Sequence, residues 1–364
     1  MDKIIEPYVM DRQFTVVGLL DTFSSFIWTD RYDKAGDFEL VMPVSVENIA
    51  LFQNDYLVLR TDSEHLMYVD TIETQSNVES GSILKVTGHS MENILDRRII
   101  WKQTRIQGNL QNGIEKLLNE NLISPEDSSR KMEGFKFVRS TDPNVTSLSV
   151  DAQFTGDSLY DAVTKIVKDA NLGFKVTMPT DGQFEFRLYS GVDRTYDQTD
   201  RPYIIFSPNF ENLMNSNSIV TYVNHRTVAL VGGEGEGSDR YLTTVEWDGG
   251  AGTGFSRREV FIDARDVSRK VNKQEVSNSE YYKMLKTRGK EHLAEYKITT
   301  TFDGEAENSR SFKYGKDFNI GDIVQLEDEY GQTFTARITE YIRSCKSGSI
   351  NEYPTFSIIN EGGN

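Results

Sequence analysis

The fold is most tightly constrained by residues 312–324, where turn-forming residues interrupt the chain at short intervals. These are Gly315, Asp317, Asn319, Gly321 and Asp322. Val324, Gln325 and Leu326 follow, then a turn-prone stretch at 327–331, and then apolar residues that alternate with polar ones at 334–339. Such alternation is typical of strands with one buried face, and two of them around a short loop predict a hairpin. With a last alternating stretch at 353–359, we expect the closing sheet of a small antiparallel barrel.

The first hundred residues repeat this pattern of short strands. Strand-like runs lie at 15–17, 25–28, 36–43, 56–59, 67–69 and 83–88. Strands this short and this regularly separated by turns predict a barrel or sandwich. Pro43 ends one run, because proline cannot donate to a sheet ladder. A short helix is expected to close the unit, with Ser90 and Asn93 at its cap. Its apolar face would be Met91, Ile94 and Leu95.

Helical and strand patterns mix over residues 101–200. Ser158 and Asp161 have the spacing of a capping box, and Gly173 fits the stop of the helix that follows. Two strand-like runs around Asp181 and Gly182 predict a hairpin. The apolar faces of the two expected helices are Leu110, Ile114 and Leu117, and Leu159, Val163, Ile166 and Ala170. We expect a mixed α+β module.

Strand patterns return after residue 200 and are interrupted once. They occur at 203–206, 219–223 and 227–231, and they resume at 298. The interruption contains two glycine-rich loops and a helix that Ser277 and Glu280 cap, running to about residue 296. The apolar face of that helix would be Tyr282, Leu285, Leu293 and Tyr296.

These patterns predict an α+β protein that is mainly β, in four parts. Residues 1–100 form a first β unit and residues 101–200 an α+β module. A second β unit is split into residues 201–235 and 297–364. Residues 236–296 form a module inserted between its halves.

Composition excludes several classes of protein. The net charge of −16 repels the phosphates of nucleic acids and anionic membranes. The single cysteine, Cys345, excludes an internal disulfide framework and a multi-cysteine metal site. The N-terminus has no apolar run of signal-peptide length, and no stretch has the roughly 18–20 apolar residues of a membrane span. We therefore expect synthesis in a cytoplasm and no membrane span.

The glycine-rich loops, 232–237 and 249–254, are the natural candidates for phosphate binding. Neither matches G-x-x-x-x-G-K-[ST], and neither places G-x-G-x-x-G between a strand and a helix. Glu236 also puts a carboxylate where a phosphate would lie. We interpret both loops as flexible connectors.

No catalytic, cofactor-binding or metal-binding residue is predicted, and no cofactor. The four histidines, His65, His89, His225 and His292, lie in different expected elements without the spacing of metal ligands. Cys345 has no identifiable base. The acidic run Glu327, Asp328 and Glu329 fits a hairpin tip, and the tryptophans Trp28, Trp101 and Trp247 are too dispersed for a sugar-stacking row. An enzyme stays possible, since glycosidase carboxylates can be far apart in sequence.

Four stretches, taken in order, carry a resemblance to a known family. They are 33–43, 86–98, 209–213 leading to 224–232, and 314–324. Their order and spacing resemble the tail hub family of bacterial viruses. More narrowly, the chain resembles the N-terminal hub region of siphophage and prophage tail-associated lysins. Baseplate hubs of contractile tails and phage-tail-like bacteriocins share the plan.

The resemblance implies a specific assembly. Such hubs have two β-barrel domains of the tail-tube type, the second interrupted by an insert. They form homotrimers, whose six barrels make a pseudo-sixfold ring between a hexameric tail tube and a threefold tip. The implied partners are the distal tail or tail tube protein, the tape-measure protein and tip or receptor-binding proteins, with DNA only as passing cargo. The implied location is the virion tail tip or baseplate, after synthesis in the bacterial host cytoplasm.

Many members of this family continue into a peptidoglycan hydrolase or a receptor-binding region, whereas this sequence ends at Asn364. No enzymatic residue is therefore carried over. Three functions stay open: a structural hub without enzymatic activity, a cell-wall polysaccharide or peptidoglycan hydrolase, and a carbohydrate-binding tail adhesin. For a hub, part of the charge of −16 would line the channel so that DNA or tape measure slides without sticking. Simple solubility is the alternative explanation.

Overall fold

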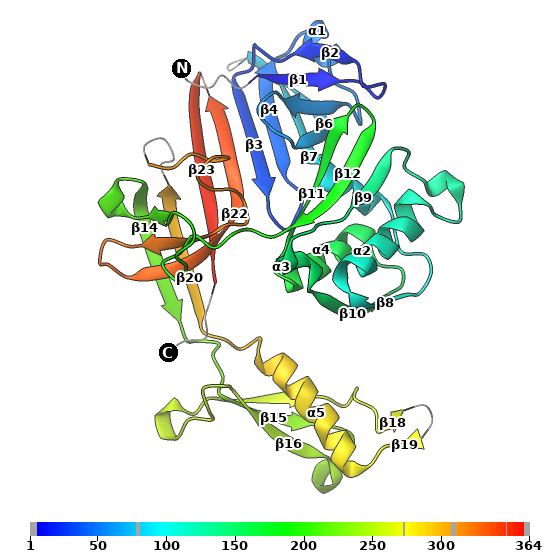
Figure 1. The fold of residues 1–364 in the computed structure, drawn as a ribbon, viewed down its shortest axis with the longest axis vertical. Coiled ribbons are helices and arrows are strands. Elements are labelled where there is room, and N and C mark those ends of the chain that lie inside the picture. The colour runs from blue at the N-terminus through cyan, green and yellow to red at the C-terminus, as the bar shows by residue number, and fades with distance from the viewer. Residues whose placement is uncertain (1–5, 78–80, 272–273, 307–310, 347, 360–364) are drawn as a thin grey trace. The chain divides into compact units, whose positions relative to one another are not determined.

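The computed structural model describes residues 6–77, 81–271, 274–306, 311–346 and 348–359 (Figure 1). The fold is mainly β and of the α+β kind that the sequence predicts. The chain divides into two compact units. The larger unit comprises the chain up to Ser216 together with Asp303–Ile359, and the inserted unit comprises Asn217–Phe302. None of the described helices is long and apolar enough to cross a membrane.

An 11-stranded sheet runs through the larger unit in the order β13-β21-β22-β3-β4-β7-β6-β5-β1-β2, and β23 also pairs with β22. Every strand expected in the first hundred residues is present, whereas β1 was not predicted. The short helix α1 (Val46–Ala50) follows β4. The strands are β1 (Pro7–Met10), β2 (Val16–Leu19), β3 (Ser25–Arg31), β4 (Asp37–Pro43), β5 (Leu57–Arg60), β6 (Leu66–Asn77), β7 (Gly81–Ser90), β13 (Ile205–Phe206), β21 (Ile323–Glu327), β22 (Thr333–Lys346) and β23 (Ser349–Ile358).

The pairing of β22 with β3 joins the two ends of the chain. Tyr341 lies opposite Asp30, and Arg343 lies opposite Trp28, in an antiparallel register. Figure 1 shows β22 and β23 next to β3. The hairpin predicted around residues 327–331 is confirmed, since β21 and β22 pair antiparallel. The strand predicted at 353–359 is confirmed as β23. The pairings among the described strands follow an open path, and they show no closed barrel.

The mixed module contains two small sheets and two longer helices. Strand β10 pairs with β8, and a second sheet has the order β11-β12-β9. The hairpin expected around Asp181 and Gly182 is confirmed by the β11–β12 pairing. The elements are β8 (Thr104–Asn109), α2 (Leu110–Leu118), η2 (Asn119–Ile123), η3 (Ser128–Arg130), β9 (Phe135–Val138), α3 (Pro143–Thr146), β10 (Ser149–Phe154), α4 (Leu159–Asp169), β11 (Gly173–Thr180) and β12 (Gln183–Tyr189).

Helix α4 begins as predicted and ends earlier than predicted. The Ser158 side chain accepts a hydrogen bond from the backbone N–H of Asp161. The helix stops before Gly173, because Asn171 adopts the left-handed conformation with φ of 55°. Its N–H donates to the Lys168 carbonyl, and the N–H of Leu172 donates to the Val167 carbonyl. These two bonds form a Schellman motif, a role in which Asn can replace Gly.

The helix predicted after β7 is present as the 3-10 helix η1 (Met91–Arg97), but its predicted cap is wrong. The hydroxyl of Ser90 makes no capping bond. It instead accepts a hydrogen bond from the backbone N–H of Gly36 at 2.7 Å. Ser90 is 2% exposed. Its hydroxyl therefore pairs with a buried N–H in the connection between β3 and β4, and not with an N–H of its own helix.

The inserted unit consists of a three-stranded sheet with a helix packed on one face. The sheet has the order β16-β15-β17. Alternate residues of β15 and its neighbours form a core with α5, among them Val231, Val245 and Leu285. The elements are β15 (Val228–Gly232), η5 (Gly237–Asp239), β16 (Leu242–Glu246), η6 (Gly254–Ser256), β17 (Glu259–Asp263), β18 (Lys270–Val271), β19 (Gln274–Glu275) and α5 (Asn278–Leu293). The chain passes between the units through η4 (Pro208–Phe210) and the paired strands β14 (Leu213–Thr221) and β20 (Thr299–Ala306).

Helix α5 is capped as predicted, and its buried face includes the predicted Leu285 and Leu293, with Tyr282 packed against the same core. The Ser277 side chain accepts a hydrogen bond from the N–H of Glu280. The buried positions are Tyr281, Leu285, Gly289 and Leu293, so Tyr281 is buried more deeply than the predicted Tyr282, and the helix ends at Leu293. The predicted strand at 227–231 is present as β15 and belongs to the sheet of the inserted unit, which begins at Asn217.

Candidate functional site

The residues weighed during sequence analysis do not assemble into one site. His65 lies 3.8 Å from the Glu92 carboxylate, His89 contacts Asp70, and His292 contacts Glu295. His225 packs edge-on against the Trp247 ring. Cys345 is buried. Within the described residues, no group of three His, Cys, Asp or Glu side chains could hold a metal ion.

The other candidate groups have structural surroundings. Asp328 forms the hairpin tip as predicted, since its carboxylate accepts hydrogen bonds from the N–H groups of Tyr330 and Gln332. The glycine-rich loops connect strands of the inserted unit. The first is held by hydrogen bonds, because the N–H of Gly233 donates to the Tyr241 carbonyl and that of Glu234 to the Tyr281 hydroxyl.

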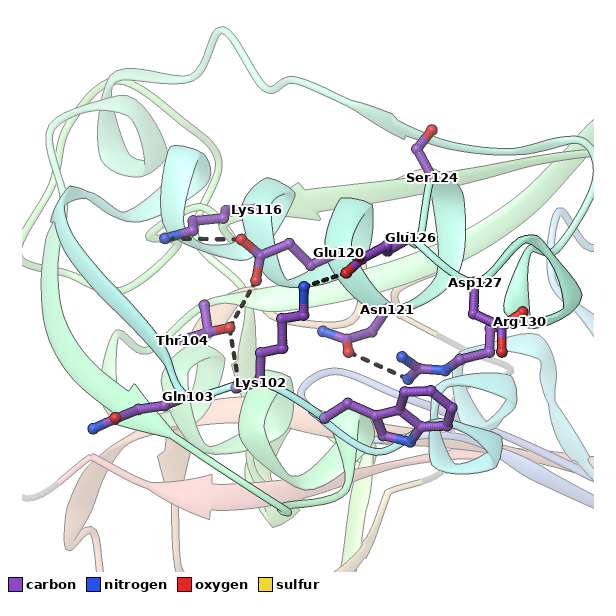
Figure 2. A pocket seen from close by; sticks show the side chains of 11 residues that line it. Lys102, Gln103, Thr104, Lys116, Glu120, Asn121, Ser124, Glu126, Asp127 and Arg130 are labelled. Carbon is purple, nitrogen blue, oxygen red and sulfur yellow. Dashed lines mark hydrogen bonds and ion pairs between the residues drawn. The ribbon is translucent and has the colours of Figure 1, made fainter.

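A pocket with a volume of about 510 Å³ opens in the mixed module of the larger unit (Figure 2). Three segments line it: residues 101–104 at the start of β8, the end of α2 with η2, and the loop 124–130. Its volume lies within the range of small-molecule sites. We refer to it as the Trp101 pocket.

The wall formed by η2 has an unusual backbone. This five-residue segment is a π helix that continues α2. The side-chain amide of Asn121 donates to the Leu117 carbonyl at 2.9 Å, the carbonyl that the Asn121 backbone N–H would bond in an α-helix. Isolated π turns within α-helices are rare and frequent at functional sites. Here the turn brings Glu120 and Asn121 into the lining of the pocket.

The glutamates of the pocket are already engaged. Glu120 accepts a hydrogen bond from the Thr104 hydroxyl at 2.7 Å and lies 3.9 Å from the Lys116 ammonium. Glu126 pairs with Lys102 (Figure 2). The hydrogen bond and charge of Lys102 hold the pKa of Glu126 below its usual range. A general acid for glycoside hydrolysis needs a raised pKa, and Glu126 does not have this property.

The rim of the Trp101 pocket carries an exposed aromatic ring beside a cation. Trp101 is 57% exposed, and the Arg130 guanidinium lies 4.0 Å from the centre of its ring. Arg130 donates to the Ile99 carbonyl at 2.7 Å and to the Asn121 amide oxygen at 3.3 Å. Figure 2 marks this last bond, which joins two residues of the pocket lining. The side chain of Arg130 is therefore fixed by neutral acceptors.

A second candidate surface lies at one edge of the large sheet. Among the described strands, β2 pairs only with β1. Gly18 of β2 lies close to Leu51, the residue after α1, so strand and helix are adjacent. This surface, here called the β2 edge, exposes Val16, Val17, Leu19, Val46 and Ile49. Exposed apolar groups beside unpaired backbone donors and acceptors favour contact with another protein.

Neither surface is predicted by the sequence patterns. The three tryptophans are too dispersed to predict a sugar-stacking row, and Trp28 is fully buried. One local feature does indicate that Trp101 is exposed: it is followed by the polar residues Lys102 and Gln103 and lies outside any alternating pattern. The β2 edge had no signal, because Val16, Val17 and Leu19 have the composition of a buried strand.

Comparison with known proteins identifies relatives by family and by fold. Residues 6–355 match the model of the family described as Siphovirus ReqiPepy6 Gp37-like protein. No curated protein matches the chain. Three similar solved structures are described as tail proteins, two of them from prophages. At their low sequence identity the likeness shows the fold alone.

The first is the tail protein from Neisseria meningitidis MC58, with a TM-score of 0.58 and 12% identity, over 98% of this chain and 97% of that one. The second is prophage tail protein gp18 from Listeria monocytogenes EGD-e, with a TM-score of 0.55 and 13% identity, over 98% and 95%. The third is the 43 kDa tail protein of prophage MuSo2 from Shewanella oneidensis, with a TM-score of 0.57 and 11% identity, over 98% of both chains.

Proposed function

Because the chain belongs to the Siphovirus ReqiPepy6 Gp37-like family and shares its fold with solved tail proteins, we propose that it is the structural hub at the tip of a phage tail. Three copies form a pseudo-sixfold ring that joins the tail tube to the tip and surrounds the DNA channel. The ring contacts the distal tail or tube protein, the tape-measure protein and tip or receptor-binding proteins. The protein acts in the virion without catalysing a reaction.

The observation that carries this proposal is the division of strands between the two ends of the chain. One strand-rich part comes from residues 7–90, and another comes from residues 205–206 and 323–358, with β3 and β22 joining them. In the proposed ring each part contributes one tube-type barrel, completed within the assembly. Two such parts in each of three copies give six barrels, the number that matches a hexameric tail tube.

The free edges of the sheet supply a contact for ring formation. The β2 edge is free on one side, and β23 pairs only with β22 among the described strands. These two edges differ from each other, so their contact would be heterologous, the kind that closes a ring when the rotation fits. Strand addition at the β2 edge would also cover Val17 and Leu19.

Mass in solution tests the proposal. Light scattering of purified protein at several concentrations should give about three times the monomer mass of 41.5 kDa. Leu19→Lys, at 70% exposure, should shift the population toward monomer, because a charge is placed in the contact. Leu242→Lys is the matched control on the exposed face of the inserted unit and should leave the trimer intact. A dimer, or a monomer that also fails to add to isolated tail tubes, would contradict the ring.

The absence of catalysis needs its own test. A zymogram on bacterial cell walls should show no cleared band at the mass of this chain. A clear band that survives repurification would favour the hydrolase alternative.

A further inference from the structure

The strongest unassigned feature is a pair of adjoining pockets. The Trp101 pocket and a second pocket of about 350 Å³ share Trp101 and Arg130 in their linings. Arg97 and Arg98 line the second pocket. The two cavities therefore meet at an exposed indole and are flanked by arginines.

Two of these arginines donate their hydrogen bonds to neutral acceptors. Arg98 donates to the carbonyls of Arg130 and Arg97, both at 2.9 Å, and Arg130 donates to the Ile99 carbonyl and the Asn121 amide. Within the part of the chain that the structure describes, neither forms an ion pair. Neighbouring cations differ, since Arg97 pairs with Asp55 and Lys102 with Glu126. Neutral acceptors thus orient both guanidinium groups, and the charge of Arg130 also helps to lower the pKa of Asp127.

The electrostatic environment of Arg98 agrees with this picture. Burial lowers the pKa of its guanidinium, and the charges of Arg130 and Arg97 lower it further. Four acidic residues line the pockets, and each has a partner of its own. Asp96 accepts from the Ser158 hydroxyl and Asp127 from Ser129, while Glu120 accepts from the Thr104 hydroxyl and Glu126 pairs with Lys102. An added anion would relieve the repulsion among the arginines. Arginine suits this role, because its planar donors match a phosphate or carboxylate.

The rest of the lining suits a sugar ring. An exposed indole presents an apolar face on which the C–H groups of a sugar can pack, while Gln103 and Ser124 offer hydrogen-bonding groups at the wall of the Trp101 pocket. Glu126 keeps acceptor capacity, since its side chain is 79% exposed. A strand of nucleic acid fits less well, because its repeated phosphates would approach Glu120, Glu126 and Asp127.

We propose that the joined pockets bind a saccharide with an anionic substituent, with the ring on Trp101 and the anionic group between Arg98 and Arg130. This activity is separate from the hub ring and does not depend on trimer formation. The substituent is a phosphate or a carboxylate. A hub with this site makes a direct contact with an acidic surface glycan.

Titration of the full chain tests the site. The probes are N-acetylglucosamine 6-phosphate, glucuronic acid and neutral N-acetylglucosamine, each up to about 10 mM and followed by isothermal titration and by ligand-observed NMR. We expect at least one anionic sugar to bind about tenfold more tightly than the neutral one. The preferred probe distinguishes a phosphate from a carboxylate. Raised salt should weaken its binding, because the contact is between charges.

Variants separate the two halves of the site. Trp101→Ala and Arg98→Gln should each weaken binding of the preferred sugar about tenfold or more, whereas Trp101→Phe should retain most of it. Lys165→Ala is the matched control, an exposed cation outside the pockets, and should bind normally. Thermal melts confirm that each variant is folded.

Three results would overturn the proposal. The first is binding of neutral and anionic sugars with equal affinity, and the second is no binding of any probe at about 10 mM. The third is preferential binding of a single-stranded oligonucleotide that depends on Trp101. None of these outcomes bears on the trimer, so failure here and failure of the hub ring are distinguishable.

Discussion

The larger unit and the inserted unit differ in net charge and in how many charged side chains they bury. The inserted unit carries 13 Lys and Arg against 12 Asp and Glu, whereas the remaining chain carries 27 against 44. The larger unit also buries charge: Arg343 is 6% exposed and pairs with Asp62 and Glu352. Asp62 in turn holds Arg60 at 2.8 Å. This cluster links the turn after β5 to β22 and β23, so ionic contacts join segments that are far apart in sequence.

The inserted unit instead relies on short-range packing. Its sheet is covered on one face by α5, and its core is formed within residues 229–293. The difference suggests that the larger unit is stabilised by long-range contacts between chain ends, whereas the inserted unit can lose or gain stability by itself. Substitutions in each unit test whether the two units lose stability independently. Amide hydrogen exchange, measured for each segment of the chain, is the common readout.

The largest effect is expected at Trp28 in the larger unit. The ring is fully buried, its Nε1–H donates to Asp30 at 2.8 Å, and the Arg60 guanidinium lies 5.2 Å from its centre. Trp28→Ala should destabilise the larger unit by about 4 kcal/mol, through the cavity and the unpaired Asp30. Trp28→Phe should cost less. Equal loss of protection in the inserted unit would show that the two units unfold together.

The second effect is a pH dependence confined to the larger unit. Burial alone would lower the pKa of His65, but the carboxylates of Asp30, Glu92 and Glu64 raise it to about 9. The protonated form is therefore stabilised by folding. This contribution, up to about 3 kcal/mol, is fully present below pH 6.5 and is lost as pH rises through about 9.

Urea unfolding of the larger unit between pH 6.5 and 9.5 measures this loss. His65→Gln should be less stable at pH 6.5 and should flatten the profile across that range. A profile that keeps its slope in the variant would assign the pH dependence to another group.

The third effect is specific to the inserted unit. Gly289 lies on the buried face of α5, where an added Cβ would meet a Val231 methyl at 2.5 Å and a Val245 methyl at 3.0 Å. Gly→Ala usually stabilises a helix by about 1 kcal/mol. Here Gly289→Ala should destabilise the inserted unit by about 2 kcal/mol, because the helix must move from the sheet. Lys286→Ala is a control on the same helix. A gain in stability would contradict the close packing.

The smallest effects come from a matched pair of caps. Ser277→Ala and Ser158→Ala each remove an N-cap hydroxyl and should cost about 1 kcal/mol in the inserted and the larger unit, respectively. Ser158→Ala should cost slightly more, because its hydroxyl also donates to Asp96 at 2.8 Å. Loss of protection in the opposite unit, measured by hydrogen exchange, would argue against independence.

Local features of this fold were predictable from the sequence, and distant pairings were not. Short strands, hairpins and the caps at Ser158 and Ser277 depend on neighbouring residues, so periodicity and turn chemistry identify them. The hydroxyl of Ser90 bonds to Gly36 instead of its own helix, a choice that only tertiary structure reveals. No pattern in the sequence predicts that β3 pairs with β22. Alternation of apolar and polar residues indicates which face of a strand is buried, but not which strand lies beside it.

The candidate site shows the same limit. The dispersed positions of the tryptophans predict no sugar-stacking row, and Trp28 is fully buried. The importance of Trp101 depends on the π turn at η2 and on Arg130, which folding brings to the ring. Exposure is a property of the packed chain, and no spacing of residues encodes it.

The β3–β22 pairing also sets an order of events during translation. Strand β3 is bonded to β4 on one side and to β22 on the other, yet about 300 residues separate β3 from β22. Until the ribosome has released residues 340–346, one side of β3 is open, and the long loop makes its closure slow. A nascent chain or a prematurely terminated one therefore lacks the completed sheet.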